Sequence, residues 1–205
     1  CIIAFITYYM DPEGDYKERV VSGMVPAGDG YWPGIKGNYY KEIVEDIIPL
    51  VETKYNTYLE DPSPEGIRAT RDHRAFSGYS RGCVCTWNIF HRDFEYFRWY
   101  APMSGHCRAG KQRNQPVSRE EVTDFLTSPL KANPGLPFFI FASCGNPDSE
   151  EMKVQMKYIT KLAGFSYGKD PAKNNIYFAI SDYYHTDFLV PYYFWNSLKV
   201  LFKGI

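Results

Sequence analysis

The serine at position 80 lies in the pattern Gly78-Tyr79-Ser80-Arg81-Gly82, which has the form G-x-S-x-G. In such a motif the serine occupies a sharp turn between a strand and a helix, where strained backbone angles expose its hydroxyl. We expect glycine at both outer positions because side chains there would collide within the turn. The helix that follows directs its first backbone N–H groups toward a developing oxyanion, and the N–H of Arg81 is the expected donor. The motif therefore predicts nucleophilic attack on an acyl group.

The same pattern occurs a second time, around Ser166. Local context separates the two, because a predicted strand precedes Ser80 and a predicted helix follows it. Ser166 instead follows a predicted helix and is soon followed by Pro171, so no helix can start at the required place. We predict that Ser166 lies in a loop and that Gly164 ends the preceding helix.

A nucleophilic serine needs a histidine base and a carboxylate that orients the histidine. Only His185 lies late in the chain, between the last predicted strand and the last predicted helix; the others are His73, His91 and His106. Asp148 follows a predicted strand at the sheet edge where α/β proteins bind ligands. Asp182 and Asp187 compete with it near His185, and we interpret them as a loop carboxylate and a helix N-cap.

Each of these three residues has an ordinary structural interpretation. A serine between glycines is usually a turn, a single histidine is usually a core or surface group, and a loop aspartate is usually a cap. Their order along the chain, Ser, Asp, His, each after a predicted strand, favours a catalytic set. The chain has no His-Glu-x-x-His sequence and its histidines are scattered, so we expect neither a metal nor a cofactor.

Strands and helices alternate along the predicted chain. We predict strands at 2–8, 73–77, 97–103, 137–143 and 175–180, and helices from 38 onward, at 83–91, around 120–125, at 149–163 and at 188–202. Residues 22–37 and 60–72 are expected to be loops, and Pro49 should kink the first helix or remove one of its hydrogen bonds. This alternation indicates a mostly parallel sheet covered by helices on both faces, an α/β fold.

Composition narrows the classes of protein that remain. The chain has 205 residues, 44% of them hydrophobic, which is enough for one large domain. Its net charge of -1 disfavours a nucleic-acid binder, and its 18% aromatic content argues against disorder. No apolar run is long enough for a membrane span. The five cysteines form no C-x-x-C pair, so we expect most to be small buried hydrophobic residues.

The chain resembles the feruloyl esterase and acetylxylan esterase family (carbohydrate esterase family 1, the esterase D-like α/β-hydrolases). Within it, the resemblance is strongest to the esterase modules of rumen and cellulosomal xylanases. It covers nearly the whole chain from residue 2 and depends mainly on residues 41–52, 73–82, 96–98, 102–105, 138–142 and 145–148, with His185 near the end. The resemblance implies an α/β-hydrolase fold with Ser80 as nucleophile, His185 as base and Asp148 as acid.

The resemblance also implies a secreted serine esterase that acts on feruloylated or acetylated xylan. Tyr79, Tyr183 and Tyr184 flank the catalytic positions and could stack on an aromatic acid or a sugar, or form an ordinary aromatic core and rim. Family members usually carry a small or apolar residue where this chain has Arg81. They also have an N-terminal section that supplies the second oxyanion donor, and we expect this section to be missing here.

We therefore expect residues 1–205 to form a single esterase domain without its N-terminal section. Because the chain starts with Cys1 in an apolar run, we expect it to be a piece of something longer. The missing section would be a separate polypeptide, or it would be absent and the catalyst incomplete. The expected protein partners are such an N-terminal polypeptide or other modules of a larger enzyme. Other hypotheses are a non-catalytic carbohydrate-binding module on a decayed hydrolase fold, a thioester or siderophore esterase, and an acyltransferase.

Overall fold

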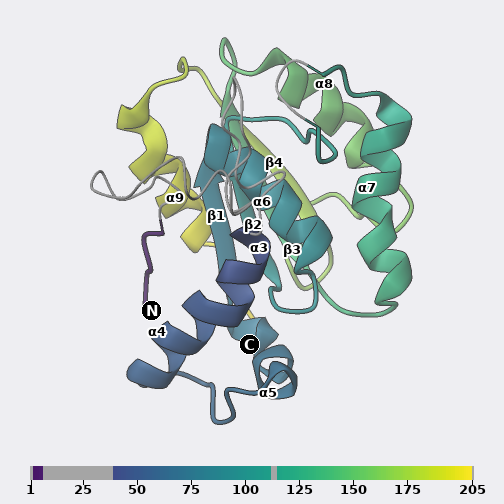
Figure 1. Ribbon diagram of the computed structural model, residues 1–205. Helices are drawn as coiled ribbons and strands as arrows, with labels where there is room; N and C mark the ends of the chain where they lie inside the picture. The colour runs from purple at the N-terminus through teal and green to yellow at the C-terminus, as the bar shows by residue number, and fades with distance from the viewer. Residues whose placement is uncertain (1, 7–38, 112–114, 205) are drawn as a thin grey trace, which may run out of the picture.

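The computed structural model describes residues 2–6, 39–111 and 115–204, and its centre is a parallel β-sheet (Figure 1). The four strands of this described part follow one another in chain order: β1 (Ala75–Tyr79), β2 (Trp99–Met103), β3 (Phe139–Gly145) and β4 (Ile176–Ser181). All neighbouring pairs are parallel. The carboxyl ends of the strands therefore meet at one edge of the sheet.

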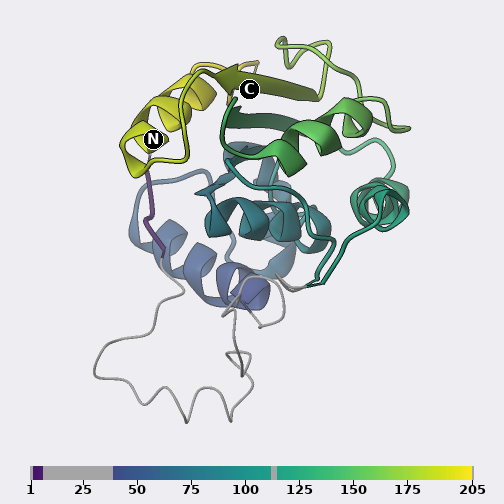
Figure 2. The same ribbon diagram turned by 90° about the horizontal axis from the view of Figure 1, so that it is seen from above.

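Three helices connect successive strands: α6 (Arg81–Arg92), α7 (Arg119–Ala132) and α8 (Glu150–Ile159). Before β1 the structure has α3 (Tyr39–Glu42), the π-helical η1 (Ile43–Ile47), α4 (Ile48–Lys54), α5 (Pro64–Ala69) and the 3-10 helix η2 (Arg71–His73). After β4 come the 3-10 helix η3 (Asp187–Leu189) and α9 (Val190–Leu198). Figure 1 shows α7 and α8 on one side of the sheet and α9 on the other, and Figure 2 shows the same separation from above. The predicted α/β fold with helices on both faces is confirmed.

Alternation of side chains along the strands explains this layering. On one face, Trp99 of β2 and Phe139 of β3 pack against Val200 and Leu201, which follow α9. On the other face, the neighbouring strand residues belong to a larger buried cluster with α6, α7 and α8: Tyr100, Ile140, Ala142, Trp87, Ile89, Leu126, Met152 and Met156. Both faces of the central strands are therefore buried, as a parallel sheet requires.

Pro49 changes the first helix as the sequence predicted. It lies in the first turn of α4, directly after the π-helical segment η1. The N–H of Ile48 donates to the carbonyl oxygen of Ile43, five residues earlier. Because proline has no N–H to donate, the missing α-helical hydrogen bond coincides with a local change of helical period.

Two predicted segments are wrong within the described residues. Residues 2–6 are not part of a strand and are largely exposed, because an apolar run forms a strand only where a neighbouring strand pairs with it; the rest of the predicted strand 2–8 lies outside the described residues. The predicted loop 60–72 contains α5 instead. Ser63 caps α5 by accepting a hydrogen bond from the N–H of Gly66, and Pro64 occupies the first turn. The predicted loop 22–37 lies outside the described residues.

Other elements differ from prediction only in their ends. Helix α7 runs for 14 residues, well beyond the expected 120–125, and begins with a capping box between Ser118 and Glu121. The C-terminal helix is shorter than the expected 188–202, because the 3-10 helix η3 precedes it and turns follow it. Four cysteines are free and buried, as expected: Cys83, Cys85, Cys107 and Cys144.

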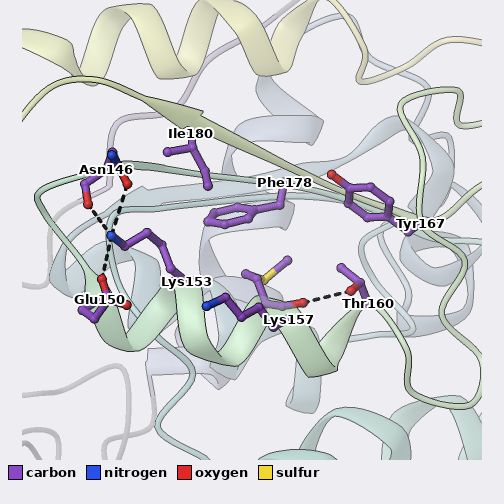
Figure 3. A pocket seen from close by; sticks show the side chains of 9 residues that line it. Asn146, Glu150, Lys153, Lys157, Thr160, Tyr167, Phe178 and Ile180 are labelled. Atoms are coloured by element: carbon purple, nitrogen blue, oxygen red, sulfur yellow. Dashed lines mark hydrogen bonds and ion pairs between the residues drawn. The ribbon is translucent and has the colours of Figure 1, made fainter.

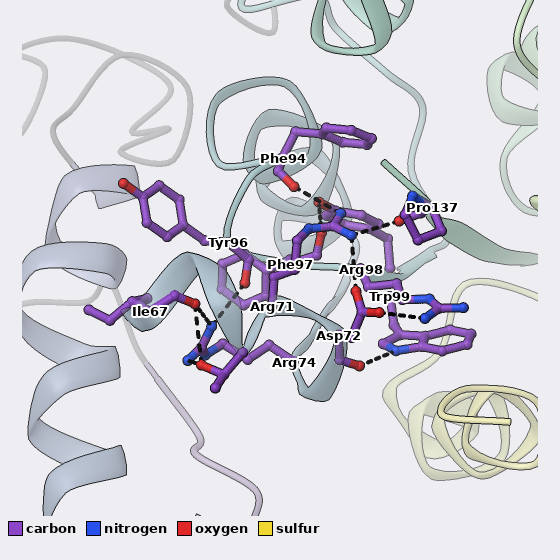
Figure 4. Close-up of polar contacts among 12 residues, drawn as sticks. Ile67, Arg71, Asp72, Arg74, Phe94, Tyr96, Phe97, Arg98, Trp99 and Pro137 are labelled. Atoms are coloured by element: carbon purple, nitrogen blue, oxygen red, sulfur yellow. Dashed lines mark hydrogen bonds and ion pairs between the residues drawn. The ribbon is translucent and has the colours of Figure 1, made fainter. Parts of the chain in front are cut away.

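A network of charged residues occupies the amino ends of the strands (Figure 4). Arg74, directly before β1, donates to both carboxylate oxygens of Glu52 and to the carbonyl of Ile67. Arg98, directly before β2, pairs with Asp72 at 2.7 Å. Arg71 donates to the carbonyl oxygens of nearby loops, as the close-up shows. These contacts anchor the segments that lead into the sheet.

Candidate active site

Ser80 lies at the turn between β1 and α6, with φ 57° and ψ −109°. A positive φ is strained for a non-glycine residue, so the surrounding turn must hold it. The N–H of Ser80 donates to the carbonyl oxygen of Met103 at 2.8 Å, and the Ser80 carbonyl accepts from the first turn of α6. The serine therefore stands between a strand end and a helix start, as the motif predicts.

The two glycines of the motif have different roles. A Cβ at Gly78 would lie 2.3 Å from the carbonyl carbon and oxygen of Gly82, so position 78 requires glycine. A Cβ at Gly82 would meet nothing within 4 Å. The expected collision at position 82 is therefore wrong: the turn brings the backbone of Gly82 close, while its own side-chain direction is open.

His185 and Asp148 form a hydrogen-bonded pair. His185 Nδ1 lies 2.8 Å from Asp148 Oδ1, and the side chains are 42% and 7% exposed. Asp148 follows β3 and His185 follows β4, so each comes from a loop at the carboxyl edge of the sheet. This edge also carries Ser80, because β1 is parallel to both strands.

Gly145 allows these two loops to meet. A Cβ at Gly145 would lie 1.8 Å from the carbonyl oxygen of Tyr183, two residues before His185. The N–H of Asp148 also donates to the carbonyl of Gly145, which closes the turn that presents the carboxylate. Any side chain at position 145 would push the histidine loop away from the aspartate loop.

Tyr79 connects the pair to the serine. Its ring stacks on the imidazole of His185, with centroids 4.7 Å apart and an interplanar angle of 27°. Since Tyr79 immediately precedes Ser80, this contact places the imidazole beside the strained turn. Within the described residues, neither His185 Nε2 nor Ser80 Oγ makes a hydrogen bond with another side chain. Tyr183 and Tyr184 are 60% and 73% exposed on the histidine loop.

Lys153 of α8 anchors the loop that carries the acid. It donates to the carbonyl and, at 3.3 Å, to the side-chain oxygen of Asn146, and it pairs with Glu150 at 2.6 Å (Figure 3). Lys153 is not among the residues predicted from the sequence, although its spacing of three residues from Glu150 on a predicted helix indicates an ion pair. A cavity of about 410 Å³ begins here and extends between α8 and β4 past Phe178 to Tyr167. Neither Ser80 nor His185 lines it.

The other three histidines have structural contacts. His73 stacks on Tyr58, and His91 Nδ1 lies 2.8 Å from the carbonyl oxygen of Phe125. His106 Nε2 lies 2.9 Å from Arg108. Burial lowers the pKa of His91 and of His106 from the ordinary histidine value.

The structure also places Ser166, Asp182 and Asp187, the residues that compete with Ser80 and Asp148 in the sequence. Ser166 lies in a loop, where its hydroxyl donates to the carbonyl of Lys173, and Gly164 before it has φ +87°. Asp182 is exposed. Asp187 is the first residue of η3, so it is not the N-cap of the last helix; that position belongs to Leu189.

Two other kinds of site, a metal centre and a membrane-spanning helix, are absent from the described residues. Across residues 2–6, 39–111 and 115–204, no three or more His, Cys, Asp or Glu side chains gather in a way that could hold a metal ion. None of the helices in these same ranges has the length and apolar character needed to cross a bilayer.

The chain is similar to known esterases in sequence and in structure. No family model matches it. It is 32% identical over 149 residues to endo-1,4-beta-xylanase Y of Acetivibrio thermocellus, a match that covers 70% of this chain and 13% of that protein. A mutant of the feruloyl esterase module from Clostridium thermocellum, complexed with sinapinate, superposes with a TM-score of 0.76 at 26% identity, covering 92% of this chain and 68% of the module.

A more distant structure shares the fold alone. The enterochelin esterase of Shigella flexneri matches with a TM-score of 0.54 at 16% identity, covering 92% of this chain and 40% of that chain. The protein therefore has an α/β-hydrolase fold, and its resemblance to the esterase modules of xylanases is confirmed.

Proposed function

We propose that the chain is a serine carboxylic-ester hydrolase that acts on plant cell-wall polysaccharide esters and releases ferulate from arabinoxylan. The observation that supports this most is the Asp148–His185 hydrogen bond beside the strained turn of Ser80, in a chain similar to a feruloyl esterase module. Three groups of complementary chemistry converge at one sheet edge, which favours catalysis over separate structural roles.

The first half of the reaction forms an acyl-enzyme. His185 Nε2 takes the proton of Ser80 Oγ, and the oxygen attacks the ester carbonyl. Asp148 keeps the imidazole oriented through Nδ1 and stabilises the imidazolium. The carbonyl electron pair moves to oxygen, where the backbone N–H of Arg81 at the start of α6 donates to it. When the C–O bond to the sugar breaks, the leaving oxygen takes the proton from His185.

The second half repeats these steps with water. His185 takes a proton from a water molecule, whose oxygen attacks the acyl carbon. The tetrahedral intermediate collapses, Ser80 Oγ leaves and regains its proton from His185, and the free acid departs. No metal or cofactor enters this scheme.

The tyrosines divide into two roles in this proposal. Tyr79 stacks on the imidazole, so we assign it to holding the base in place. Tyr183 and Tyr184 lie exposed on the same loop and offer faces for a phenolic acid or a sugar ring. The proposed substrate is accordingly a feruloylated xylan, with acetylated xylan as the alternative.

We also infer that the chain works among other modules of a secreted enzyme. The support is that its match covers only 13% of xylanase Y, a relative far longer than this chain. A polysaccharide in plant cell walls is too large to enter a cell, which favours an extracellular place of action.

The test compares the two serines that share the G-x-S-x-G pattern. Ser80→Ala should abolish turnover of methyl ferulate and covalent labelling by a fluorophosphonate probe, whereas Ser166→Ala should leave both unchanged. Turnover of acetylated xylan, measured beside turnover of methyl ferulate, shows whether the enzyme prefers acetyl or feruloyl esters. Turnover that persists in Ser80→Ala, or a loss caused by Ser166→Ala, would contradict the assignment. If the wild-type chain does not react with the fluorophosphonate probe but binds xylan, the result would favour a non-catalytic binding module.

A further inference from the structure

The cavity between α8 and β4 lies at the opposite edge of the described sheet from Ser80. Its volume of about 410 Å³ is within the range of pockets that hold small ligands. We call it the α8–β4 groove. Its two ends are Asn146 and Tyr167, and its two sides are Lys153 and Lys157 of α8 and Phe178 and Ile180 of β4 (Figure 3).

The β4 side of the groove is apolar and partly open to solvent. Ile176, Phe178 and Ile180 alternate along β4 and therefore share the face that α8 covers. Ile176 is fully buried, Phe178 is half-buried and Ile180 is 53% exposed. Helix α8 thus covers the start of β4 and leaves the later side chains accessible, so the groove offers an apolar wall to a ligand.

Tyr167 supplies an aromatic ring at the far end of the groove. Its ring stacks on that of Tyr177, with centroids 5.8 Å apart and an interplanar angle of 21°, and its backbone forms a parallel bridge with Ile176. These contacts hold the ring in place although the residue is 53% exposed. An anchored, accessible aromatic ring is suited to packing against the apolar face of a sugar.

The two lysines of the groove differ in their partners. Lys153 pairs with Glu150 at 2.6 Å and donates to Asn146. Lys157 follows one helical turn later and is exposed; Figure 3 shows its ammonium on the α8 side of the groove, and no ion pair or hydrogen bond joins it to another described residue. Because Glu150 is already paired with Lys153, the positive charge of Lys157 is available to an anionic ligand.

This combination of surfaces fits a carboxylated sugar better than a neutral or a purely apolar ligand. The sugar ring has an apolar face for Phe178 and Tyr167, its hydroxyls suit the amide of Asn146, and its carboxylate suits Lys157. The groove and Ser80 lie at strands three spacings apart, roughly 14 Å at the usual strand separation. A ligand in the groove is therefore a different unit from the one whose ester reaches Ser80.

We propose that the α8–β4 groove binds a uronic acid unit, a sugar that carries a carboxylate, on the polysaccharide that is de-esterified at Ser80. The carboxylate pairs with Lys157, and the ring packs against Phe178 and Tyr167. The groove thereby selects acidic over neutral chains. Binding of the sugar is independent of catalysis, and only its place on the substrate rests on the proposed esterase function.

The experiment measures binding of two oligosaccharides to the wild-type chain by isothermal titration calorimetry. One is xylotriose with a glucuronic acid branch, and the other is unbranched xylotriose; neither carries an ester, so no turnover is needed. The branched sugar should bind about tenfold more tightly, because one charge-assisted contact is added.

The variants locate this preference. Lys157→Met removes the ammonium but keeps an apolar stem, and it should weaken binding of the branched sugar about tenfold while leaving the unbranched sugar unaffected. The matched control is Lys161→Met, four residues further on and outside the groove, which should change neither. Tyr167→Ala should weaken binding of both sugars by about fivefold, because both pack against the ring.

The outcomes keep the two proposals apart. Equal affinity for the two sugars, no binding of either, or an unchanged preference in Lys157→Met would overturn the uronic acid site. If the preference is present and depends on Lys157 in a chain that does not turn over methyl ferulate, the site stands and the esterase function is refuted.

Discussion

The two ends of the sheet differ in how well their polar groups are paired and in the strain of their backbone. At the amino ends, the buried Arg74 has carboxylate, carbonyl and hydroxyl acceptors, and Arg98 pairs with Asp72. At the carboxyl ends, Ser80 and Ser104 have strained backbones, and Asp148 Oδ2 is buried without a partner among the described residues. The difference indicates that the amino edge of the sheet stabilises the fold. The carboxyl edge instead keeps strained backbone and an unpaired polar atom, as active sites often do.

The largest effect should come from the carboxyl end and appear in activity. Asp148→Asn keeps the size of the side chain but removes the charge that orients and stabilises protonated His185. We expect kcat on methyl ferulate to fall by about 10³–10⁴-fold, as the loss of a triad acid does elsewhere. Stability should change little, because the carboxylate is only partly satisfied in the folded state.

The matched control is Asp182→Asn, which alters an exposed carboxylate near the same histidine. It should retain full kcat. If both substitutions had equal effects, or if Asp148→Asn kept kcat within tenfold, the role of Asp148 would have to be withdrawn.

The next effect should come from the amino end and appear in stability. Arg74→Ala leaves the poorly exposed carboxylate of Glu52 without its partner. We expect the free energy of unfolding to fall by about 3–5 kcal/mol, measured by urea denaturation. Arg68→Ala removes partly exposed contacts with Glu65, Glu95 and Tyr96 and should cost less, about 1 kcal/mol.

We expect the folded fraction of Arg74→Ala to keep the wild-type kcat, because the amino ends of the strands contribute to stability and not to catalysis. A fall in kcat without a fall in stability would mean that the two ends are not separate in function.

The smallest effect concerns an exception at the amino end. Asp93, at the end of α6, is 3% exposed, and burial raises the pKa of its carboxyl from 3.8 to about 8. The folded chain therefore holds this proton more tightly than the unfolded chain does. Stability should decrease as pH rises from about 4 to about 8, the window between the two pKa values.

Asp93→Asn should weaken this decrease. The melting temperature of the variant minus that of the wild type should therefore be larger at pH 8 than at pH 5. Thermal melts at several pH values measure it, with the exposed Asp124→Asn as control. A midpoint difference that does not vary with pH would show that Asp93 is not the group responsible.

The strongest sequence patterns predicted the four described strands of the sheet. The apolar run before Asp148 predicted β3 within two residues, because a doubly buried parallel strand leaves a continuous apolar signal. The order of strands also explains why Asp148 and His185, 37 residues apart, meet at one edge. Their catalytic roles remain predictions.

Other features depend on contacts that a linear pattern does not contain. The run at residues 2–6 has the composition of a strand, but strand formation depends on a partner. Helix α5 was missed because its apolar pattern is weak, although Ser63 and Pro64 carried a capping signal. The hydrogen bond between Tyr193 of α9 and Ser181 at the end of β4 is a further contact that serine and tyrosine spacing alone does not indicate.

The close contact at Gly145 has a consequence for motion. With the carbonyl of Tyr183 placed where a Cβ would be, the histidine loop rests directly on the backbone of the aspartate loop. Outward movement of the aspartate loop would carry the histidine loop with it, since the Asp148–His185 bond spans the same interface. The base and its acid are thus coupled mechanically as well as electrostatically.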